Sequence, residues 1–255
     1  MNKLRLYIDI PYEDKSEALR LGARWSKTTK KWYIHNTISN VNEYMKFSKW
    51  LFAKSNDLII ATEFLFIAQG YRTCWRCRQK TKVAALGVGE FAHIFDNYNY
   101  TQCRYFDTSK NPGTEFHLAW AMNEHDIPPK LLQYLKKNFS VWSSYSYYSG
   151  RREFSNHCDH CGAVQGTKHL FFNPDSPFCL INIDDETEIE NKVSKLKIIG
   201  IPILDDLLLK WNVLITDKDD NYIKYAAPGY LSLSNNKYTD YAKYNELYYF
   251  TDIRR

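Results

Sequence analysis

The sequence predicts an α+β protein with a small N-terminal βαβ-type unit, a β-rich middle domain and a mixed C-terminal extension. Some short runs alternate apolar and polar residues, as half-buried strands do, while others follow a helical spacing. Hydrophobic residues make up 44% of the 255 residues and aromatic residues 16%, enough for a sizeable core. Two Cys-x-x-Cys pairs stand at the two ends of the middle region. We place the three parts at residues 1–54, 55–179 and 180–255.

Residues 1–54 have the pattern of a compact unit. Residues 4–10 alternate strictly between apolar and polar, which predicts a strand that Pro11 ends. A short helix is expected from Glu13 to Leu21, with acids in its first turns and Gly22 as its stop. A return strand follows at residues 31–34, and Ser39 can cap a second helix running to about residue 54.

Three blocks of this unit resemble a known small domain of unknown function. They are Tyr-Ile-Asp-Ile-Pro-Tyr at residues 7–12, Ala-Leu-Arg-Leu-Gly-Ala-Arg-Trp at 18–25 and Lys-Lys-Trp-Tyr-Ile at 30–34. That domain is appended to TraC-type plasmid-transfer DNA primases and to other bacterial accessory proteins. The resemblance covers a fifth of the chain and implies association with DNA-processing proteins. No primase catalytic motif accompanies it.

The middle and C-terminal parts mix strand and helix patterns. Strands are expected at residues 58–61, 64–68, 82–87, 116–120 and 141–148. Pro128 and Pro129 open a helix to about residue 138, because proline is favoured in the first helical turn. Beyond residue 180, helices are expected at 188–197 and 204–211, and strands at 222–227 and 244–250.

The two Cys-x-x-Cys pairs predict a zinc site made by Cys74, Cys77, Cys158 and Cys161. Each pair can form a tight turn that directs two thiolates at one point, and four thiolates suit tetrahedral Zn²⁺. Such a closed site has no open position for water, so the metal would be structural. The 80 residues between the pairs would fold and return, which makes the metal a long-range cross-link. An iron–sulfur cluster, a redox pair and reduced thiols remain alternatives.

The surroundings of these cysteines resemble an uncharacterised bacterial zinc-binding domain. Its layout is Cys-x-x-Cys, a long insert, and Cys-x-x-Cys-Gly-Ala-x-Gln-Gly, which here ends at residue 166. The resemblance supports a metal site and implies no activity. We expect Arg76, Arg78, His157 and His160 to offset the negative charge of the site, with His160 as a minor alternative ligand. Cys103 and Cys179 are expected to be core thiols.

Positive charge is concentrated at the N-terminus. Residues 1–54 hold 11 Lys and Arg against 5 Asp and Glu, a net charge of +6, whereas residues 180–255 hold 10 against 13, or −3. Basic side chains near aromatic ones suit contacts with nucleic acid. Trp25 and Trp32 are expected to build the core of the unit. The candidate phosphate contacts are Arg20, Arg24, Lys27, Lys30, Lys31 and Lys49.

The sequence lacks the motifs of several functional classes. No apolar run is long enough for a membrane span and no signal-peptide core is present, so we expect a cytoplasmic protein without a membrane partner. It contains no phosphate-binding loop, dinucleotide fingerprint, zinc-protease motif or nucleophile elbow. We therefore expect no catalytic residues. The main hypothesis is a nucleic-acid-associated accessory factor, and the alternative is an immunity or antidefence factor that binds a toxin or effector protein. An enzyme whose site is assembled from residues distant in the sequence remains a third hypothesis.

Overall fold

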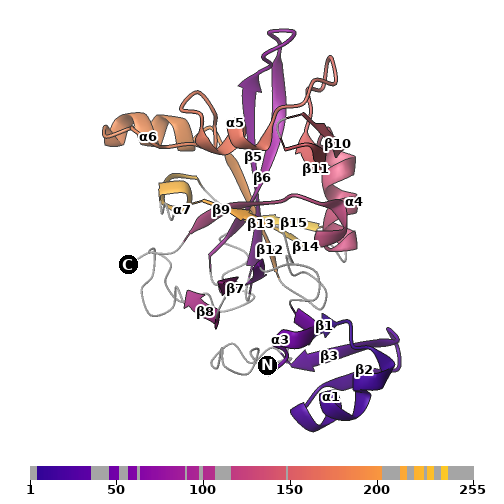
Figure 1. The fold of residues 1–255 in the computed structure, drawn as a ribbon. Coiled ribbons are helices and arrows are strands. Elements are labelled where there is room, and N and C mark those ends of the chain that lie inside the picture. The colour runs from indigo at the N-terminus through magenta and orange to yellow at the C-terminus, as the bar shows by residue number, and fades with distance from the viewer. Residues whose placement is uncertain are drawn as a thin grey trace.

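The computed structural model combines short helices with four mainly antiparallel sheets, which confirms the α+β class (Figure 1). The residues that it describes are 5–35, 46–51, 57–61, 64–89, 91–97, 100–106, 116–147, 149–202, 213–216, 221–226, 229–232 and 237–240.

The N-terminal unit is a three-stranded antiparallel sheet with a helix between its first two strands. β1 (Arg5–Ile8) leads through a 3-10 turn, η1 (Tyr12–Asp14), into α1 (Lys15–Leu21), and β2 (Arg24–Ser26) and β3 (Lys31–His35) follow. The sheet order is β1-β3-β2, so β2 adds one strand to the expected βαβ pattern. Gly22 ends α1 at φ 103°, a left-handed conformation that suits glycine. Most of the helix expected after Ser39 lies outside the described residues, which hold only α3 (Ser48–Leu51).

The two tryptophans of this unit have different environments. Trp32 is buried with Leu6, Ala18 and Ile34, as expected. Trp25 is 48% exposed and packs edge-on against Trp32, with ring centres 5.4 Å apart. The expectation that Trp25 is a core residue is therefore wrong, because the short strand β2 lies at the edge of the sheet and no further strand of the described residues covers that side.

A seven-stranded sheet forms the centre of the rest of the molecule. Its order is β13-β9-β6-β5-β12-β14-β15, and every neighbouring pair is antiparallel except β12–β14. Four of its strands come from beyond residue 180, so the sheet joins the middle part of the chain to the C-terminal part. The strands are β5 (Phe64–Thr73), β6 (Lys80–Val88), β9 (His117–Ala121), β12 (Lys197–Pro202), β13 (Val213–Ile215), β14 (Gly229–Ser232) and β15 (Lys237–Asp240).

Two smaller sheets accompany it. β4 (Asp57–Ala61), β7 (Phe91–Asn97) and β8 (Tyr100–Phe106) form one, and β10 (Val141–Ser146) and β11 (Arg151–Asn156) form a hairpin. The hairpin of β5 and β6 extends beyond the large sheet, and its turn lies at the top of Figure 1. Residues 74–79 form that turn, so the first cysteine pair is carried at the tip of a long hairpin.

The remaining helices are short. They are η2 (Glu124–Asp126), α4 (Pro129–Asn138), α5 (Thr167–Phe172), α6 (Glu186–Val193) and α7 (Asn221–Tyr225). α4 begins at Pro129 as expected. The strand expected at 222–227 is wrong, because α7 places Tyr222 and Ala226, four residues apart, in the core together. The helix expected at 188–197 ends at Val193, and β12 begins at Lys197. The elements expected at 204–211 and 244–250 lie outside the described residues.

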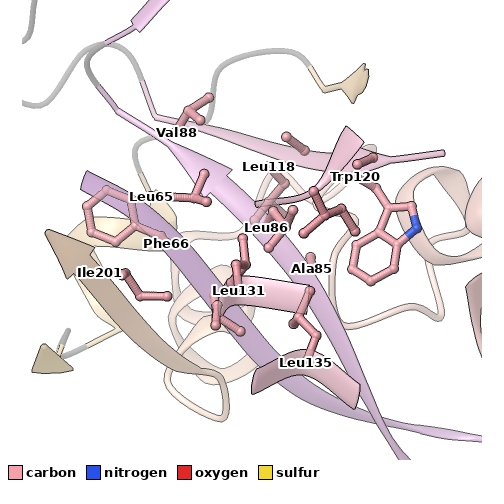
Figure 2. Close-up of a cluster of buried hydrophobic side chains, with 14 of the residues drawn as sticks. Leu65, Phe66, Ala85, Leu86, Val88, Leu118, Trp120, Leu131, Leu135 and Ile201 are labelled. Carbon is pink, nitrogen blue, oxygen red and sulfur yellow. The ribbon is translucent and has the colours of Figure 1, made fainter. Parts of the chain in front are cut away.

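Part of the core lies between α4 and the large sheet (Figure 2). Leu131 and Leu135, one helical turn apart on α4, are fully buried, as are Leu65 on β5 and Leu86 on β6. The indole N–H of Trp120 donates to the carbonyl of Phe154 over 2.8 Å, and the two rings stack. This contact fixes β11, and the second cysteine pair that follows it, against the large sheet.

Candidate metal centre

The two Cys-x-x-Cys segments have the same backbone hydrogen bonds. In residues 74–79, the N–H of Cys74 donates to the carbonyl of Gln79 and the N–H of Arg78 to that of Cys74. In residues 158–163, the N–H of Cys158 donates to the carbonyl of Ala163 and the N–H of Gly162 to that of Cys158. We call these two turns the first and second knuckles. Their common geometry directs both thiols of each pair to one side.

Each knuckle contains one left-handed residue directly after its second cysteine. The φ angles are 63° at Arg78 and 67° at Gly162. Glycine adopts this region freely, whereas a side chain makes it costly by about 1–2 kcal/mol. Both knuckles therefore contain the same left-handed turn. Its conformational cost is present at Arg78 and absent at Gly162.

The structure brings the four predicted cysteines together. Their sulfur atoms all lie within 4.8 Å of one another, with Cys74 Sγ 3.7 Å from Cys161 Sγ and Cys77 Sγ 3.6 Å from Cys158 Sγ. A tetrahedron with metal–sulfur bonds of about 2.3 Å has edges of about 3.8 Å. Both of these contacts run between the knuckles, so an ion at the centre would join both pairs. The cluster can therefore hold one metal ion.

The sulfur spacing and the local backbone argue against a disulfide, a multi-iron cluster and a redox pair. The inter-knuckle separations of 3.6 and 3.7 Å are far longer than a disulfide bond of about 2.05 Å, and all four thiols are free. A multi-iron cluster would have to place several iron and sulfide atoms between its thiolates, which calls for a wider set. Cys74 follows the strand β5 and precedes a turn rather than a helix, unlike a redox pair at a helix start.

Hydrogen bonds and burial shift the pKa values of the two thiols of the first knuckle in opposite directions. Burial acts to raise the pKa of the Cys74 thiol, but N–H groups of Cys77 and Arg76, aided by Cys158 and Gln165, lower that pKa to about 6. The N–H of Gln79 acts to lower the pKa of Cys77, but burial and the neighbouring sulfurs raise it to about 12. Four clustered thiols thus share the negative charge unevenly, and a cation has to displace the Cys77 proton. Acidification therefore weakens metal binding.

Residues around the sulfurs supply hydrogen bonds and positive charge. The backbone N–H groups of Arg76 and His160 each lie 3.4 Å from a thiol, that of Cys74 and Cys158 respectively. The buried Gln165 Nε2 lies 3.4 Å from Cys74 Sγ and donates to the carbonyl of Ala163. The Nε and Nη1 atoms of Arg72 are buried without a hydrogen-bond partner among the described residues. Its guanidinium interacts with the charge of Cys74, which helps to balance a four-thiolate site.

The two histidines expected to face the sulfurs have other partners. His160 Nε2 lies 3.0 Å from the carbonyl of Lys80, to which it donates. His157 is buried and stacks on Trp142, and its Nδ1 donates to the carbonyl of Ser155 over 2.9 Å. Only the backbone N–H of His160 lies near a sulfur. The expected side-chain role of both residues at the site is therefore wrong, and so is His160 as a ligand.

Polar contacts fasten the second knuckle to β6. The buried Asn156 side chain both accepts from the N–H of Ala84, at 2.8 Å, and donates to its carbonyl, at 2.9 Å. The Asp159 carboxylate accepts from the N–H of Lys82 and from the hydroxyl of Ser140. These bonds, with desolvation opposing them, lower the pKa of Asp159. They position Cys158 opposite the first knuckle.

A tryptophan connects the two knuckles directly. The indole N–H of Trp75 donates over 2.8 Å to the carbonyl of Val164, 89 residues away. The layout of the resemblance includes Gln165, but no sequence pattern predicted a role at the site for Trp75, Gln165, Asn156, Asp159 or Arg72. Trp75 and Asp159 lie inside the cysteine pairs, and the other three lie two to four residues from one, so proximity to the cysteines was the available indication.

The six candidate phosphate contacts lie on the surface of the N-terminal unit. Arg20, Arg24, Lys27, Lys30, Lys31 and Lys49 are all exposed. Lys27 and Lys30 stand in the turn between β2 and β3, and Lys31 begins β3. Lys49 differs from them, because its ammonium pairs with Asp14 at 2.8 Å and Glu17 at 3.2 Å. Five of the six are thus exposed cations without an ion pair among the described residues, while the charge of the sixth is offset locally.

The two other cysteines take no part in the cluster. Cys179 is buried and free, in keeping with a core thiol. The side chain of Cys103 is outside the described part of the structure. Within that part, no helix has both the length and the apolar character needed to cross a membrane.

A family model described as a domain of unknown function (DUF5710) matches residues 5–51. The match confirms a domain of unknown function at the N-terminus and covers the three-stranded unit. Its links to primases, and the family of the four-cysteine region, stay predictions. No curated protein and no solved structure matches the chain.

Proposed function

We propose that this chain is a non-enzymatic, zinc-stabilised binding protein that contacts nucleic acid through its N-terminal unit. The observation that supports it best is the convergence of four thiols from two knuckles within 4.8 Å. A metal with four thiolate ligands keeps no position for water or substrate, so its contribution is structural. Reduced cysteine pairs of this kind fit a cytoplasmic protein.

Zinc is the metal that the donor set favours. Four sulfur ligands at tetrahedral spacing suit Zn²⁺ and exclude the hard cations, which prefer oxygen. Bound there, the ion would join the tip of the β5–β6 hairpin to the segment after β11. Because the two cysteine pairs are separated by 80 residues, such a cross-link removes much conformational freedom from the unfolded chain.

The exposed basic surface of the N-terminal unit supports the nucleic-acid part of the proposal. Lys30 and Lys31 line a shallow hollow of about 400 Å³ together with the half-exposed Trp25. A cation next to an exposed ring suits a phosphate and its neighbouring base. The acidic side chain of Asp9 also lines this hollow, so the lysines have to outweigh one negative charge there.

Salt-dependent binding of the full chain to DNA tests this. Each lysine that contacts a phosphate adds about 0.9 to the slope of log affinity against log salt for duplex DNA. The triple replacement of Lys27, Lys30 and Lys31 by alanine should lower that slope by about 3. Lys49→Ala is the matched control and should change it by less than about 1, because Asp14 and Glu17 already offset that charge. No binding of DNA at low salt would rule the proposal out.

The second candidate function is the binding of a protein partner, such as the toxin or effector of an immunity or antidefence system. Exposed aromatic residues on the β10–β11 hairpin favour it: Trp142 is 41% exposed, Tyr145 50% and Tyr147 94%. Tyr and Trp are enriched in the centres of protein interfaces. A partner that co-purifies in stoichiometric amount, and is lost on Tyr147→Ala, would support this function instead.

A further inference from the structure

A groove lies directly beside the four-cysteine cluster. Both knuckles, the β10–β11 hairpin, and α5 with the residues after it form its walls, and its volume is about 900 Å³. We call it the knuckle groove and define it by Trp75, Arg76, Tyr145, Tyr147, Lys168 and Phe172. This volume is within the range of sites that bind ligands.

Aromatic rings from three separate segments are exposed in the knuckle groove. Trp75 of the first knuckle is 59% exposed, Tyr147 after β10 is 94% exposed and Phe172 at the end of α5 is 45% exposed. Trp75 is held in place by its bond to Val164. Exposed rings from separate segments around one hollow offer stacking surfaces for flat molecules, and their exposure costs hydration free energy unless something covers them.

The charges of the groove favour an anion. Arg76 and Lys168 line it, and both are exposed. The acidic residue of the lining, Glu153, has its carboxylate 3.3 Å from Arg151 Nε, which offsets its charge. Arg72, beside Cys74, counters part of the negative charge of the neighbouring thiolates. Among the residues that line the groove, positive charge therefore exceeds negative charge.

A buried hydroxyl adds a polar contact point. Thr167 lines the groove and is only 6% exposed, and its Oγ1 has no hydrogen-bond partner among the described residues. A buried hydroxyl without a partner is costly, and a bound polar group would relieve that cost. Ser144, also in the lining, is held by the buried His157: because Nδ1 of His157 donates to a carbonyl, its Nε2 accepts from the Ser144 hydroxyl at 3.2 Å.

We propose that the knuckle groove binds single-stranded nucleic acid, with bases stacked on its aromatic rings and phosphates near Arg76 and Lys168. Flat rings, cations and a free hydroxyl together match nucleotides, whereas apolar anchors alone would suffice for a peptide. Bases in a duplex are already stacked on each other, so these rings select a single strand. This inference rests on the proposed nucleic-acid function and assigns to it a second, strand-selective surface.

Fluorescence anisotropy with the full, zinc-loaded chain tests the inference. The probes are a labelled single strand of about 16 nucleotides and the corresponding duplex. Removing one stacking ring should weaken binding to the single strand by about tenfold. Tyr147→Ala is the first variant, because a side chain 94% exposed contributes little to folding. Binding to the duplex should stay unchanged. Tyr71→Ala, which removes a 47% exposed ring that lines neither the knuckle groove nor the hollow of the N-terminal unit, is the matched control and should change neither affinity.

The outcomes separate the two proposals. Loss of single-strand binding alone, on Tyr147→Ala and on Arg76→Ala, supports the groove. The groove inference is wrong if the groove variants change the affinity for neither probe, or weaken the binding of both probes equally. The proposed function still stands in that case, provided that both probes bind and that their binding depends on Lys27, Lys30 and Lys31. If neither probe binds at low salt, both are wrong. Binding of a protein partner that depends on Tyr147, with no effect of this residue on single strands, also overturns the groove inference.

Discussion

At the scale of single residues, the two knuckles differ most in one backbone position. Gly162 and Arg78 adopt nearly the same left-handed φ, 67° and 63°, but only glycine does so without strain. No heavy atom lies within 4 Å of a Cβ built on Gly162, so the cost of a side chain there would come from the backbone alone. The two positions therefore form an internal comparison.

Gly162→Ala should lower the free energy of unfolding by about 1 kcal/mol. Arg78→Gly should leave it unchanged or raise it by up to about 1 kcal/mol, because relief of strain is partly offset by the freedom of glycine in the unfolded chain. Urea unfolding of the metal-loaded chain measures both. An Arg78→Gly variant as destabilised as Gly162→Ala would show that the Arg78 side chain, rather than the backbone, governs the first knuckle.

At the scale of elements, one side chain makes the backbone hydrogen bonds that a neighbouring strand would otherwise make. β9 pairs with β6 only at Leu86–Val88, so the backbone groups of Ala84 lack a partner strand on that side. Asn156 provides it with an amide that both donates and accepts. The contact lies two residues before Cys158 and connects the sheet to the second knuckle.

Asn156→Ala should lower the free energy of unfolding by about 2–4 kcal/mol, because a buried N–H and a buried carbonyl lose their partners together. Asn138→Ala is the control: its amide donates to the Tyr134 carbonyl at the end of α4, and its loss should cost about 1 kcal/mol or less. Chemical denaturation compares the two. Equal costs would mean that water or a shifted β9 takes over at Ala84.

The elements also show how far the sequence allowed prediction. Strict alternation located β1, and Pro129 located the start of α4, because both patterns are local. The segment from Tyr222 to Ala226 contains residue types that favour strands, but its apolar residues have a helical spacing. The burial of Tyr222 and Ala226 together favours the helix α7 over a strand. β12 pairs with β5, from more than 120 residues earlier in the sequence, and no local pattern specifies that register. The same limit applies to Asn156 and Arg72, whose roles depend on the tertiary arrangement.

At the scale of the whole molecule, one sheet incorporates strands from both sides of residue 180. We infer that the middle and C-terminal parts fold as one unit and that the N-terminal unit folds around its own three strands. The metal would then hold together the far tip of the β5–β6 hairpin and the segment leaving β11. The spacing of the cysteines was sufficient to choose them, whereas the groove beside them, built from three distant segments, had no counterpart in the sequence.

The central claim is that the four thiolates hold a single zinc ion. Native mass spectrometry of the full chain, purified under reducing conditions, tests it most directly. We predict one zinc ion per chain, and its loss in a Cys77→Ser, Cys161→Ser double variant, which removes one ligand from each knuckle. A folded chain that carries no metal, or that carries iron with sulfide, would contradict the claim.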